Sequence, residues 1–451
     1  MSTNKIQVTS CGAIVPKTPE LITKCTTELH VKPLTHPDFP ELDSFDVYQE
    51  KEEHLCLPVH WAQKNIHDGA IEYQLSEEQK EQIPTDRFTF NGAPREHQLE
   101  AVDTSLDHLK KDGRGILCLQ TGGGKTFTSL YLAAKLGHRI LVVIHKRSLL
   151  QQWENEIKTF LPNATIGYLW QKHNDTKADI VLAMWQTLLK RKDVTPTWNT
   201  IIVDECHRIC SKEFSQIMFK VNAQYAIGLS ATPSRKDGLL DVLYWHLGPI
   251  MYQQAPTNRS TLPVLVKQLS FHTPDYDKYR NSIAKQYVRV ISTITTNPDR
   301  TRMILKEVIG ITKRKDASER YILILTERVK HAELVHAALG EIFKQTPDMT
   351  VGLFVGSQTM ENLTRAKEAR IIVATYKIFE EGESIERLNT LIMASPKKDV
   401  RQSIGRIFRK VHSINPIIID ISDSILAGMA RKRLDTIKTE TNGMMKSVND
   451  L

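Results

Sequence analysis

The chain contains 451 residues, of which 41% are hydrophobic and 25% charged, and its formal net charge is +8. This length predicts two or three domains, and the basic balance favours a polyanionic partner such as nucleic acid. No apolar run is long enough to span a bilayer, and the first residues lack the apolar centre of a signal peptide. We therefore expect an intracellular protein without a membrane segment. The cysteines are scattered, which argues against a disulfide framework, and Cys206, His207 and Cys210 lack the second ligand pair that a zinc site needs.

Residues 1–84 differ in composition from the rest of the chain. They are rich in Pro and Thr, and the short apolar segments at residues 27–33 and 54–58 are typical of short strands. We expect a small accessory domain here, of mixed or β-rich structure.

From about residue 85, apolar runs alternate with helical periods. A helix is expected at residues 126–136 and another through Trp153, and the runs expected to be buried strands are residues 116–119, 139–144, 179–184, 201–203 and 225–229. Continuous apolar strands separated by helices predict a parallel sheet with helices on both faces.

A second series of the same kind follows. Its helix is expected at residues 331–343, and its strands at residues 321–325, 351–355, 371–373, 390–393 and 417–419. The predicted fold class is therefore α/β, with two tandem parallel-sheet domains after the accessory domain. The predicted boundaries are 1–84 for the accessory domain, 85–250 for the first sheet domain, 251–315 for a connecting segment, 316–436 for the second sheet domain and 437–451 for a tail.

A glycine-rich turn lies between an expected strand and an expected helix. Three glycines let the backbone turn tightly and aim N–H groups at phosphate oxygens, and the following helix N-terminus favours an anion. This context predicts a P-loop that binds ATP, although Leu119 stands where the strict motif has Gly or Ala. In this interpretation Lys125 reaches the β- and γ-phosphates and the Thr126 hydroxyl binds Mg²⁺. The predicted nucleotide-binding residues of the turn are Gln120, Thr121, Gly122, Gly123, Gly124, Lys125 and Thr126.

Two adjacent carboxylates follow the apolar run at residues 201–203. This order places Asp204 and Glu205 at the carboxyl edge of a parallel sheet, where ligands bind. Asp204 is predicted to hold Mg²⁺, and Glu205 to polarise the attacking water as a general base. A short acidic string alone often only caps a helix, but here it follows the glycine-rich turn on a separate strand.

At this point the sequence resembles superfamily 2 DExH-box helicases, whose motifs occur in order between residues 90 and 410. Arg95 and Gln98 resemble residues that read adenine, residues 143–153 resemble a motif that contacts the nucleic-acid backbone, and residues 180–188 resemble the motif after it. The resemblance implies two tandem RecA-like domains and the cofactors ATP and Mg²⁺. It also implies residues that couple ATP to domain movement, namely His207, Ser230, Ala231, Thr232 and Gln402, and two arginine fingers, Arg406 and Arg409.

Within the superfamily the sequence resembles the XPB-like branch, and above all the transcript-release helicases of poxviruses and their relatives in other large cytoplasmic DNA viruses. The likeness to the XPB-like branch is carried by residues 228–238 and by residues 276–304, which include 297–300. There are departures: Lys236 replaces an acidic residue, and Ser384 stands where many relatives have Asp near the ribose. Gly382 is therefore taken as the nucleotide-site residue of that segment. If the protein is viral, the implied location is the host cytoplasm or the virion.

The resemblance implies that hydrolysis requires both domains, since the arginines lie on the second and Lys125 and Glu205 on the first. We expect an ATPase that moves on nucleic acid, with DNA favoured over RNA and with transcription machinery as a further partner. An RNA-directed helicase and an ATP-gated binding module of a transcription complex remain alternatives. Basic residues such as Lys146 and Arg147 are candidate phosphate contacts. The tryptophans at 153, 170, 185 and 198 are expected in the core or between domains rather than under bases.

Overall fold

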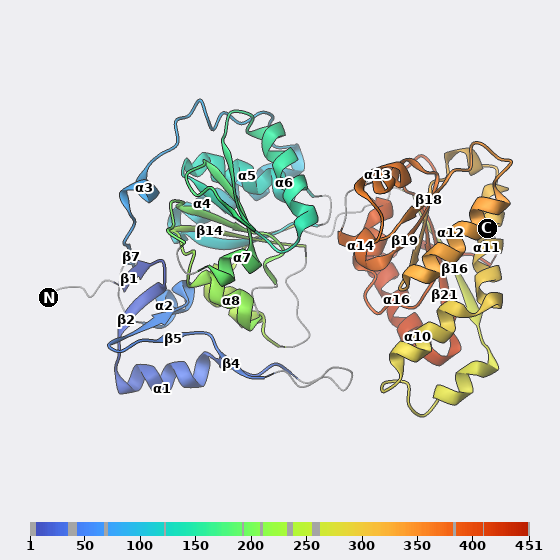
Figure 1. Cartoon of the computed structure of the whole chain (residues 1–451), viewed down its shortest axis with the longest axis horizontal. Coiled ribbons are helices and arrows are strands. Elements are labelled where there is room, and N and C mark those ends of the chain that lie inside the picture. Colours follow the sequence, from blue (N-terminus) through green and yellow to red (C-terminus); the bar gives the residue numbers. More distant parts are fainter. Residues whose placement is uncertain are drawn as a thin grey trace. The chain divides into compact units, whose positions relative to one another are not determined.

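Two units with separate cores make up the structure. The computed structural model describes residues 6–34, 43–66, 71–120, 123–191, 194–207, 211–231, 238–254, 262–381, 385–408 and 410–449. The first unit comprises Met1–Ala255 and the second Pro256–Leu451, and Figure 1 colours them along the chain from blue to red. Within these described ranges, no helix is long and apolar enough to cross a membrane.

The main sheet of the first unit has the strand order β11-β10-β12-β9-β13-β14-β8-β15, and its strands are parallel except for the edge strand β11. Its strands are β8 (Arg114–Cys118), β9 (Ile140–Ile144), β10 (Ile166–Trp170), β11 (His173–Asn174), β12 (Ile180–Met184), β13 (Thr200–Val203), β14 (Tyr225–Ser230) and β15 (Ile250–Gln253). All five strands predicted from the apolar runs are confirmed, whereas β10, β11 and β15 were not predicted because half-exposed residues interrupt their apolar pattern.

Helices cover both faces of this sheet, as the continuous apolar strands predict. Leu141 and Val143 of β9 face one core, and Ile140, Val142 and Ile144 face the other. The helices α4 (Glu96–Asp112), α5 (Lys125–Leu136) and α6 (Arg147–Phe160) pack on the second of these cores. The first core is covered by α7 (Trp185–Lys190), α8 (Lys212–Met218) and α9 (Leu240–Leu247).

The N-terminal region forms a small sheet of mixed direction within the first unit, and its status as a separate domain stays a prediction. Its sheet has the order β5-β6-β2-β1-β7, in which only the β1–β7 pair is parallel. The strands are β1 (Ile6–Thr9), β2 (Gly12–Pro16), β5 (Gln49–Glu50), β6 (His54–Leu57) and β7 (Ile71–Tyr73), accompanied by the helices α1 (Pro19–Glu28), α2 (Val59–Asn65) and α3 (Glu77–Lys80) and the strand pair β3 (His30–Val31) and β4 (Phe45–Asp46). The strand at 54–58 is confirmed. The strand at 27–33 is wrong over its first residues, because Thr27 and Glu28 end α1, which Thr18 caps and Pro19 begins.

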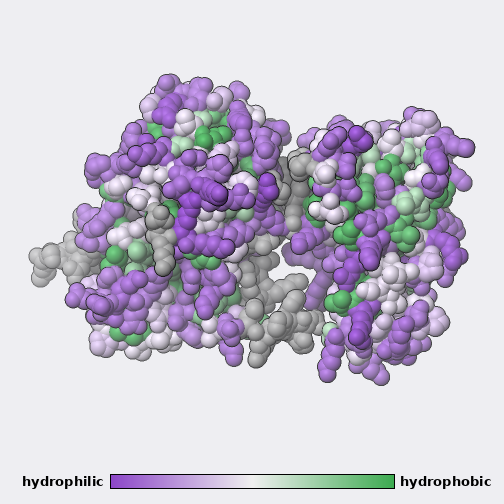
Figure 2. Space-filling view, in the orientation of Figure 1, coloured by the Kyte–Doolittle hydropathy of each residue, from purple (hydrophilic) through white to green (hydrophobic). Residues whose placement is uncertain are grey.

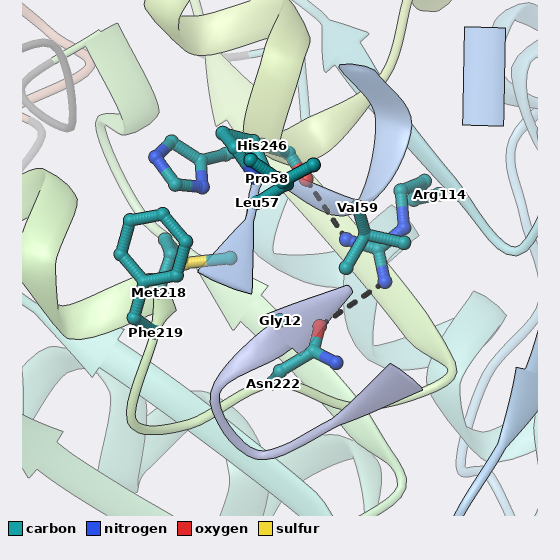
Figure 3. A pocket seen from close by; sticks show the side chains of 9 residues that line it. All are labelled: Gly12, Leu57, Pro58, Val59, Arg114, Met218, Phe219, Asn222 and His246. Carbon is teal, nitrogen blue, oxygen red and sulfur yellow. Dashed lines mark hydrogen bonds between the residues drawn. The ribbon is translucent and has the colours of Figure 1, made fainter. Parts of the chain in front are cut away.

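Within the first unit, the N-terminal accessory region shares a core with the main sheet, and a buried arginine joins the two. The Arg114 guanidinium donates hydrogen bonds to His246 O (2.8 Å), Ala223 O (3.0 Å), Asn222 Oδ1 (3.2 Å) and the Tyr73 hydroxyl (3.1 Å). Asn222 Nδ2 in turn donates to Thr9 O at 2.9 Å. Figure 3 shows Arg114, Asn222 and His246 beside Gly12 and Val59 of the N-terminal region. Since these contacts involve the start of β8 and the loop before β14, the accessory domain holds the amino ends of two central strands.

The sheet of the second unit has the order β18-β19-β17-β20-β21-β16-β22, and all its pairs are parallel. Its strands are β16 (Val264–Phe271), β17 (Ile322–Thr326), β18 (Val351–Phe354), β19 (Ile371–Thr375), β20 (Thr390–Met393), β21 (Ile417–Asp423) and β22 (Met445–Ser447). The five predicted strands are confirmed. In addition, β16 comes from the residues predicted to connect the domains and β22 from the predicted tail, so both segments contribute to this sheet; the domain boundaries themselves remain predictions.

Helices cover both faces of the second sheet as well. The helices α10 (Tyr287–Thr296), α11 (Pro298–Thr312) and α12 (Val329–Ile342) pack on one face. On the other lie α13 (Met360–Glu368), α14 (Tyr376–Glu381), α15 (Arg401–Ile404) and α16 (Ala427–Glu440). Figure 2 shows the result at the surface: hydrophilic side chains cover most of the visible face of each unit, and apolar ones occur in small groups.

A buried ion pair joins α11 to the carboxyl end of β21. Arg300 Nε and Nη2 donate to the two carboxylate oxygens of Asp423 at 2.8 and 2.9 Å, and both side chains are buried. The Tyr276 hydroxyl donates to the same carboxylate at 2.8 Å. Asp423 and burial together raise the pKa of Tyr276. Each charge in this group therefore depends on its partners, because little water reaches it.

Arg300→Met is expected to lower the free energy of unfolding by about 3–5 kcal/mol, because the Asp423 charge would stay buried without its cation. The matched control is Arg302→Met on the same helix, whose exposed pair with Asp299 should contribute at most about 1 kcal/mol. Urea denaturation of the full chain, with hydrogen exchange followed in β21, measures the difference. Equal losses for the two variants would contradict the assigned role of the buried pair.

Candidate nucleotide-binding site

Three adjacent parallel strands of the first unit bring the predicted ATP residues to one edge of the sheet. The strands β13, β14 and β8 are neighbours, with Val203 paired to Gly228 and Ser230 to Cys118. Asp204 and Glu205 follow β13, Ser230 ends β14, and Gln120 follows β8 closely. Because parallel strands end at the same edge, the sheet places the carboxylates and the glycine-rich turn within reach of one ligand.

The glycine-rich turn has the tight backbone that a phosphate loop requires. Gly123 N donates to Gln120 O at 2.8 Å, and Gly124 has a φ of +83° at the start of α5. A Cβ at Gly124 would lie 2.1 Å from Gln98 Nε2, and one at Gly123 would lie 2.8 Å from Gln254 Oε1. The positive φ favours glycine at position 124, and a side chain at either position would displace a glutamine that contacts the turn. Thr121 and Gly122 lie outside the described residues.

The first turn of α5 carries Lys125 and Thr126. Lys125 Nζ donates to Leu119 O at 3.4 Å, so its side chain folds back over the turn. The first turn of α5 contains no acidic residue. The positive end of the helix dipole is therefore available to an anion, and together with the glycine backbone this arrangement fits a phosphate group.

The two carboxylates are held in different ways. Asp204 Oδ2 accepts a hydrogen bond from Trp153 Nε1 at 3.1 Å, and its Oδ1 accepts one from Glu205 N at 3.0 Å. Burial and the charge of Glu205 raise the pKa of Asp204 to about 6, although Trp153 and Lys125 act in the opposite direction. Trp153 was expected to be a core residue; its ring is buried, and its indole N–H also orients the predicted metal ligand.

Glu205 has a left-handed backbone, with a φ of +49°. Such a conformation is uncommon for a residue with a side chain, costs on the order of 1 kcal/mol, and often marks a functional position. Its Oε2 lies 3.4 Å from His207 Nδ1. The predicted base and the predicted coupling histidine are thus in contact, and both are partly exposed at the sheet edge.

A magnesium ion would find two of its ligands here. Thr126 and Asp204 supply a hydroxyl and a carboxylate, the oxygen donors that Mg²⁺ prefers when nucleotide phosphates complete its shell. Among the residues that the structure describes, there is no group of three His, Cys, Asp or Glu side chains that could hold a metal ion. This donor set suits an ion that arrives with a nucleotide.

Two glutamine side chains brace the turn. Gln98 Oε1 accepts from Arg95 N at 3.0 Å, and Gln98 Nε2 donates to Gly123 O at 3.4 Å. Gln98 is buried and Arg95 exposed, so in this structure the Gln98 amide contacts the turn, and its adenine-reading role stays a prediction. Gln254, which the sequence did not reveal, accepts from Gln120 N at 3.1 Å. It follows β15, whose pairing with β8 no motif predicts.

The remaining predicted site residues divide between the two units. Ser230 is buried at the end of β14 and Ala231 is partly exposed, whereas Thr232 lies outside the described residues. In the second unit Gln402 is exposed on α15, and Arg406 is 3% exposed, with its Cζ 5.7 Å from the Phe379 ring centroid. Arg406 is therefore not on a solvated helix face. Gly382 and Arg409 lie outside the described residues.

Asp204→Asn is expected to stabilise the metal-free protein above about pH 6. A carboxyl whose folded-state pKa is raised from 3.8 to about 6 destabilises the fold when ionised, so that penalty is absent below pH 3.8 and complete above pH 6. Removing the charge should raise the free energy of unfolding at pH 8 by roughly 1–2 kcal/mol, with no gain near pH 3.5. Denaturation at both pH values measures this. The exposed Asp103→Asn on α4 should show no such pH-dependent gain, and a loss of stability for Asp204→Asn at pH 8 would contradict the assignment.

Comparison with known proteins places this site in a helicase context. Residues 91–235, which contain the glycine-rich turn and both carboxylates, match the family described as "Type III restriction enzyme, res subunit". The chain is 28% identical over 443 residues to the "Putative ATP-dependent RNA helicase L396" of Acanthamoeba polyphaga mimivirus, covering 93% of this chain and 82% of that protein. It is 26% identical over 377 residues to the "Putative helicase 161L" of Invertebrate iridescent virus 6, covering 79% and 82%.

Solved structures show the same fold at low sequence identity. The fragment of a "putative HsdR subunit of a type I restriction enzyme" from Vibrio vulnificus YJ016 matches with a TM-score of 0.57 and 17% identity, covering 83% of this chain and 71% of that one. The protein Dbp5 of S. cerevisiae, bound to RNA and ADP BeF3, matches with a TM-score of 0.54 and 14% identity, covering 79% and 90%. The fold is therefore that of two tandem RecA-like domains, and the sequence relatives include proteins of large DNA viruses that are named as helicases.

Proposed function

We propose that the protein is an ATP-dependent helicase that hydrolyses ATP with Mg²⁺ and uses the energy to move along nucleic acid, with DNA favoured over RNA. One observation carries this proposal: the glycine-rich turn and the Asp204–Glu205 pair lie at the same edge of one sheet, on strands separated only by β14. Such a pair beside a phosphate loop has the parts that phosphoryl transfer needs, namely a phosphate cradle, a metal ligand and a base. The helicase names of the viral relatives support the coupling to nucleic acid.

The first unit would bind and activate the nucleotide. The backbone of the turn and Lys125 would hold the phosphates, and Thr126 and Asp204 would hold Mg²⁺, which neutralises charge on the phosphate oxygens. Trp153 keeps one oxygen of Asp204 in a fixed direction. Glu205 would accept a proton from the attacking water, and its contact with His207 would orient the carboxylate.

The second unit would supply cations to the transferring phosphoryl group. We assign this role to Arg406 and Arg409, with Gly382 beside the ribose and Gln402 linking ATP state to movement. An arginine that stabilises the developing charge is typically worth about 10³- to 10⁵-fold in rate. The contact between Arg406 and the Phe379 ring would set the direction of the guanidinium before ATP binds.

The substrate and the process are the finer part of the proposal. The likeness to transcript-release helicases favours a role in viral transcription or repair, in the host cytoplasm or the virion, with transcription machinery as a partner. An RNA-directed helicase is the second candidate, since a viral relative is named an RNA helicase and Dbp5 was solved with RNA. Displacement of a labelled strand from tailed DNA and RNA duplexes decides between them. If neither duplex is separated, the protein is a translocase that moves on nucleic acid without unwinding it.

ATP hydrolysis is expected to rise at least tenfold when single-stranded nucleic acid is added. Glu205→Gln should lower kcat by about 10²- to 10⁴-fold with nucleotide binding retained, because it removes only the base. Lys125→Ala should abolish hydrolysis and weaken ATP binding. Lys135→Ala, an exposed lysine at the other end of α5, serves as the matched control. Phosphate release is measured without nucleic acid and with single-stranded DNA, duplex DNA and RNA. If none of these raises the rate of hydrolysis, the proposed motor is contradicted and the ATP-gated binding module remains.

Arg406→Ala is expected to lower kcat by about 10³-fold or more while the Kd for ATP changes little, because the guanidinium acts on charge that develops in the transition state. Arg401→Ala provides the control on the preceding helix, where the guanidinium pairs with Asp399 at 2.8 Å. Since Arg406 is buried, circular dichroism first establishes that the variant is folded. Wild-type hydrolysis by a folded Arg406→Ala protein would remove this residue from the mechanism.

A further inference from the structure

A row of planar side chains lies on the hairpin formed by β10 and β11, outside the nucleotide site. Trp170 and His173 are paired across the two strands, and their rings are nearly parallel, with centroids 6.4 Å apart and an interplanar angle of 13°. The Arg147 guanidinium lies over the Trp170 ring, 4.9 Å from its centroid. Trp170 is only partly buried, and Arg147 and His173 are exposed. We call Arg147, Trp170, Lys172 and His173 the hairpin platform.

The hairpin is held rigidly by hydrogen bonds to one arginine. Arg191, which follows α7, donates through Nη2 to Gln171 O at 3.0 Å and to His173 O at 2.8 Å, and through Nη1 to Asn174 Oδ1. In the turn that joins Trp170 to His173, Gln171 has a left-handed backbone with a φ of +52°. A turn in this uncommon conformation persists when its surroundings hold it, so the platform keeps its geometry before any ligand binds.

The platform lies at the same edge of the sheet as the nucleotide site. Leu169, Ala183, Val143 and Val203 form one row of paired residues across β10, β12, β9 and β13. The next residue of β10 is Trp170 and the next after β13 is Asp204, so both lie at the same level. Three strand spacings separate them, which corresponds to about 14 Å along the edge.

Positive charge surrounds the exposed rings. Lys146 is the N-cap of α6 and Arg147 its first residue, Lys172 occupies the hairpin turn, and Arg191 donates hydrogen bonds to the hairpin. Of the described acidic residues on the hairpin and on α6, Asp175 is exposed and Glu154 pairs with Lys158. Exposed planar groups with cations beside them match the two faces of a single strand, in which bases stack on rings and phosphates pair with cations. Duplex nucleic acid hides its base faces, so it does not suit this platform.

We propose that the hairpin platform binds single-stranded nucleic acid, with a base stacked on the His173–Trp170 row and the adjoining phosphates on Arg147 and Lys172. This inference rests on the proposed function and adds a contact to bases, with little sequence preference because every base has a stacking face. Trp170 packs against a core of the first unit, in line with the expectation, and the proposal adds a contact of its exposed part to a base.

The test compares full-length variants in their affinity for labelled single strands of 20 nucleotides, as DNA, as RNA and as an abasic DNA strand. His173→Ala and Trp170→Ala should weaken binding to DNA and RNA about 5- to 100-fold, the range for loss of one stacked base. The same two variants should bind the abasic strand about as tightly as the wild-type protein does, because that strand has no base to stack and keeps its phosphates. Trp170→Tyr should restore binding, and the ATPase rate without nucleic acid should match that of the wild type.

Lys172→Gln should lower the slope of log Kd against log salt by about 1, and the exposed Lys177→Gln is its matched control.

Two results would overturn the inference. In the first, His173→Ala, an exposed substitution that leaves the core intact, and folded Trp170→Ala both bind DNA and RNA as tightly as the wild type. In the second, the substitutions weaken binding of the abasic strand as much as binding of the normal strand, which would mean that the two rings only position the Arg147 guanidinium. Failure of the proposed function looks different, since then the wild-type protein binds no strand and its ATPase is not stimulated.

Discussion

The parallel alignment of buried strands is the constraint on which the rest of this structure depends. Strands that are apolar on both faces must be covered by helices on both sides, and each crossover returns the chain to the same starting edge. Every strand of the central group in the first unit therefore ends at one edge. Residues that follow β8, β9, β10, β13 and β14 meet there without any of the loops having to be long.

Charged groups inside this protein show two different solutions to burial. Arg300 and Asp423 are joined by two hydrogen bonds, so that each charge offsets the cost of burying the other. Asp204 instead lies beside another carboxylate, which together with burial raises its pKa. Two neighbouring carboxylates lower the stability of the protein when no cation is bound. The same repulsion favours binding of Mg²⁺, because the ion neutralises it. The left-handed backbone of Glu205 is a second local cost at the same place.

The accessory domain acts on the opposite side of the same sheet. Through Arg114 and Asn222 it holds the amino ends of β8 and β14, whose carboxyl ends carry the glycine-rich turn and Ser230. A strand that is held at its amino end by a buried hydrogen-bonded arginine is a rigid support for the residues at its other end. These hydrogen bonds lie at the edge of the sheet opposite the glycine-rich turn.

By itself the sequence determined the α/β class, eleven of the strands and the residues of the glycine-rich turn and the acidic pair, because periodicity and local motifs depend on neighbours along the chain. Only the tertiary structure showed that Trp153 orients Asp204, that Gln254 braces the turn and that Arg406 is buried. It also showed that β16 and β22 complete the second sheet and that Arg147, Trp170 and His173 form a row. Each of these depends on contacts between residues far apart in sequence, which arise from strand order and helix packing and leave no local pattern to read.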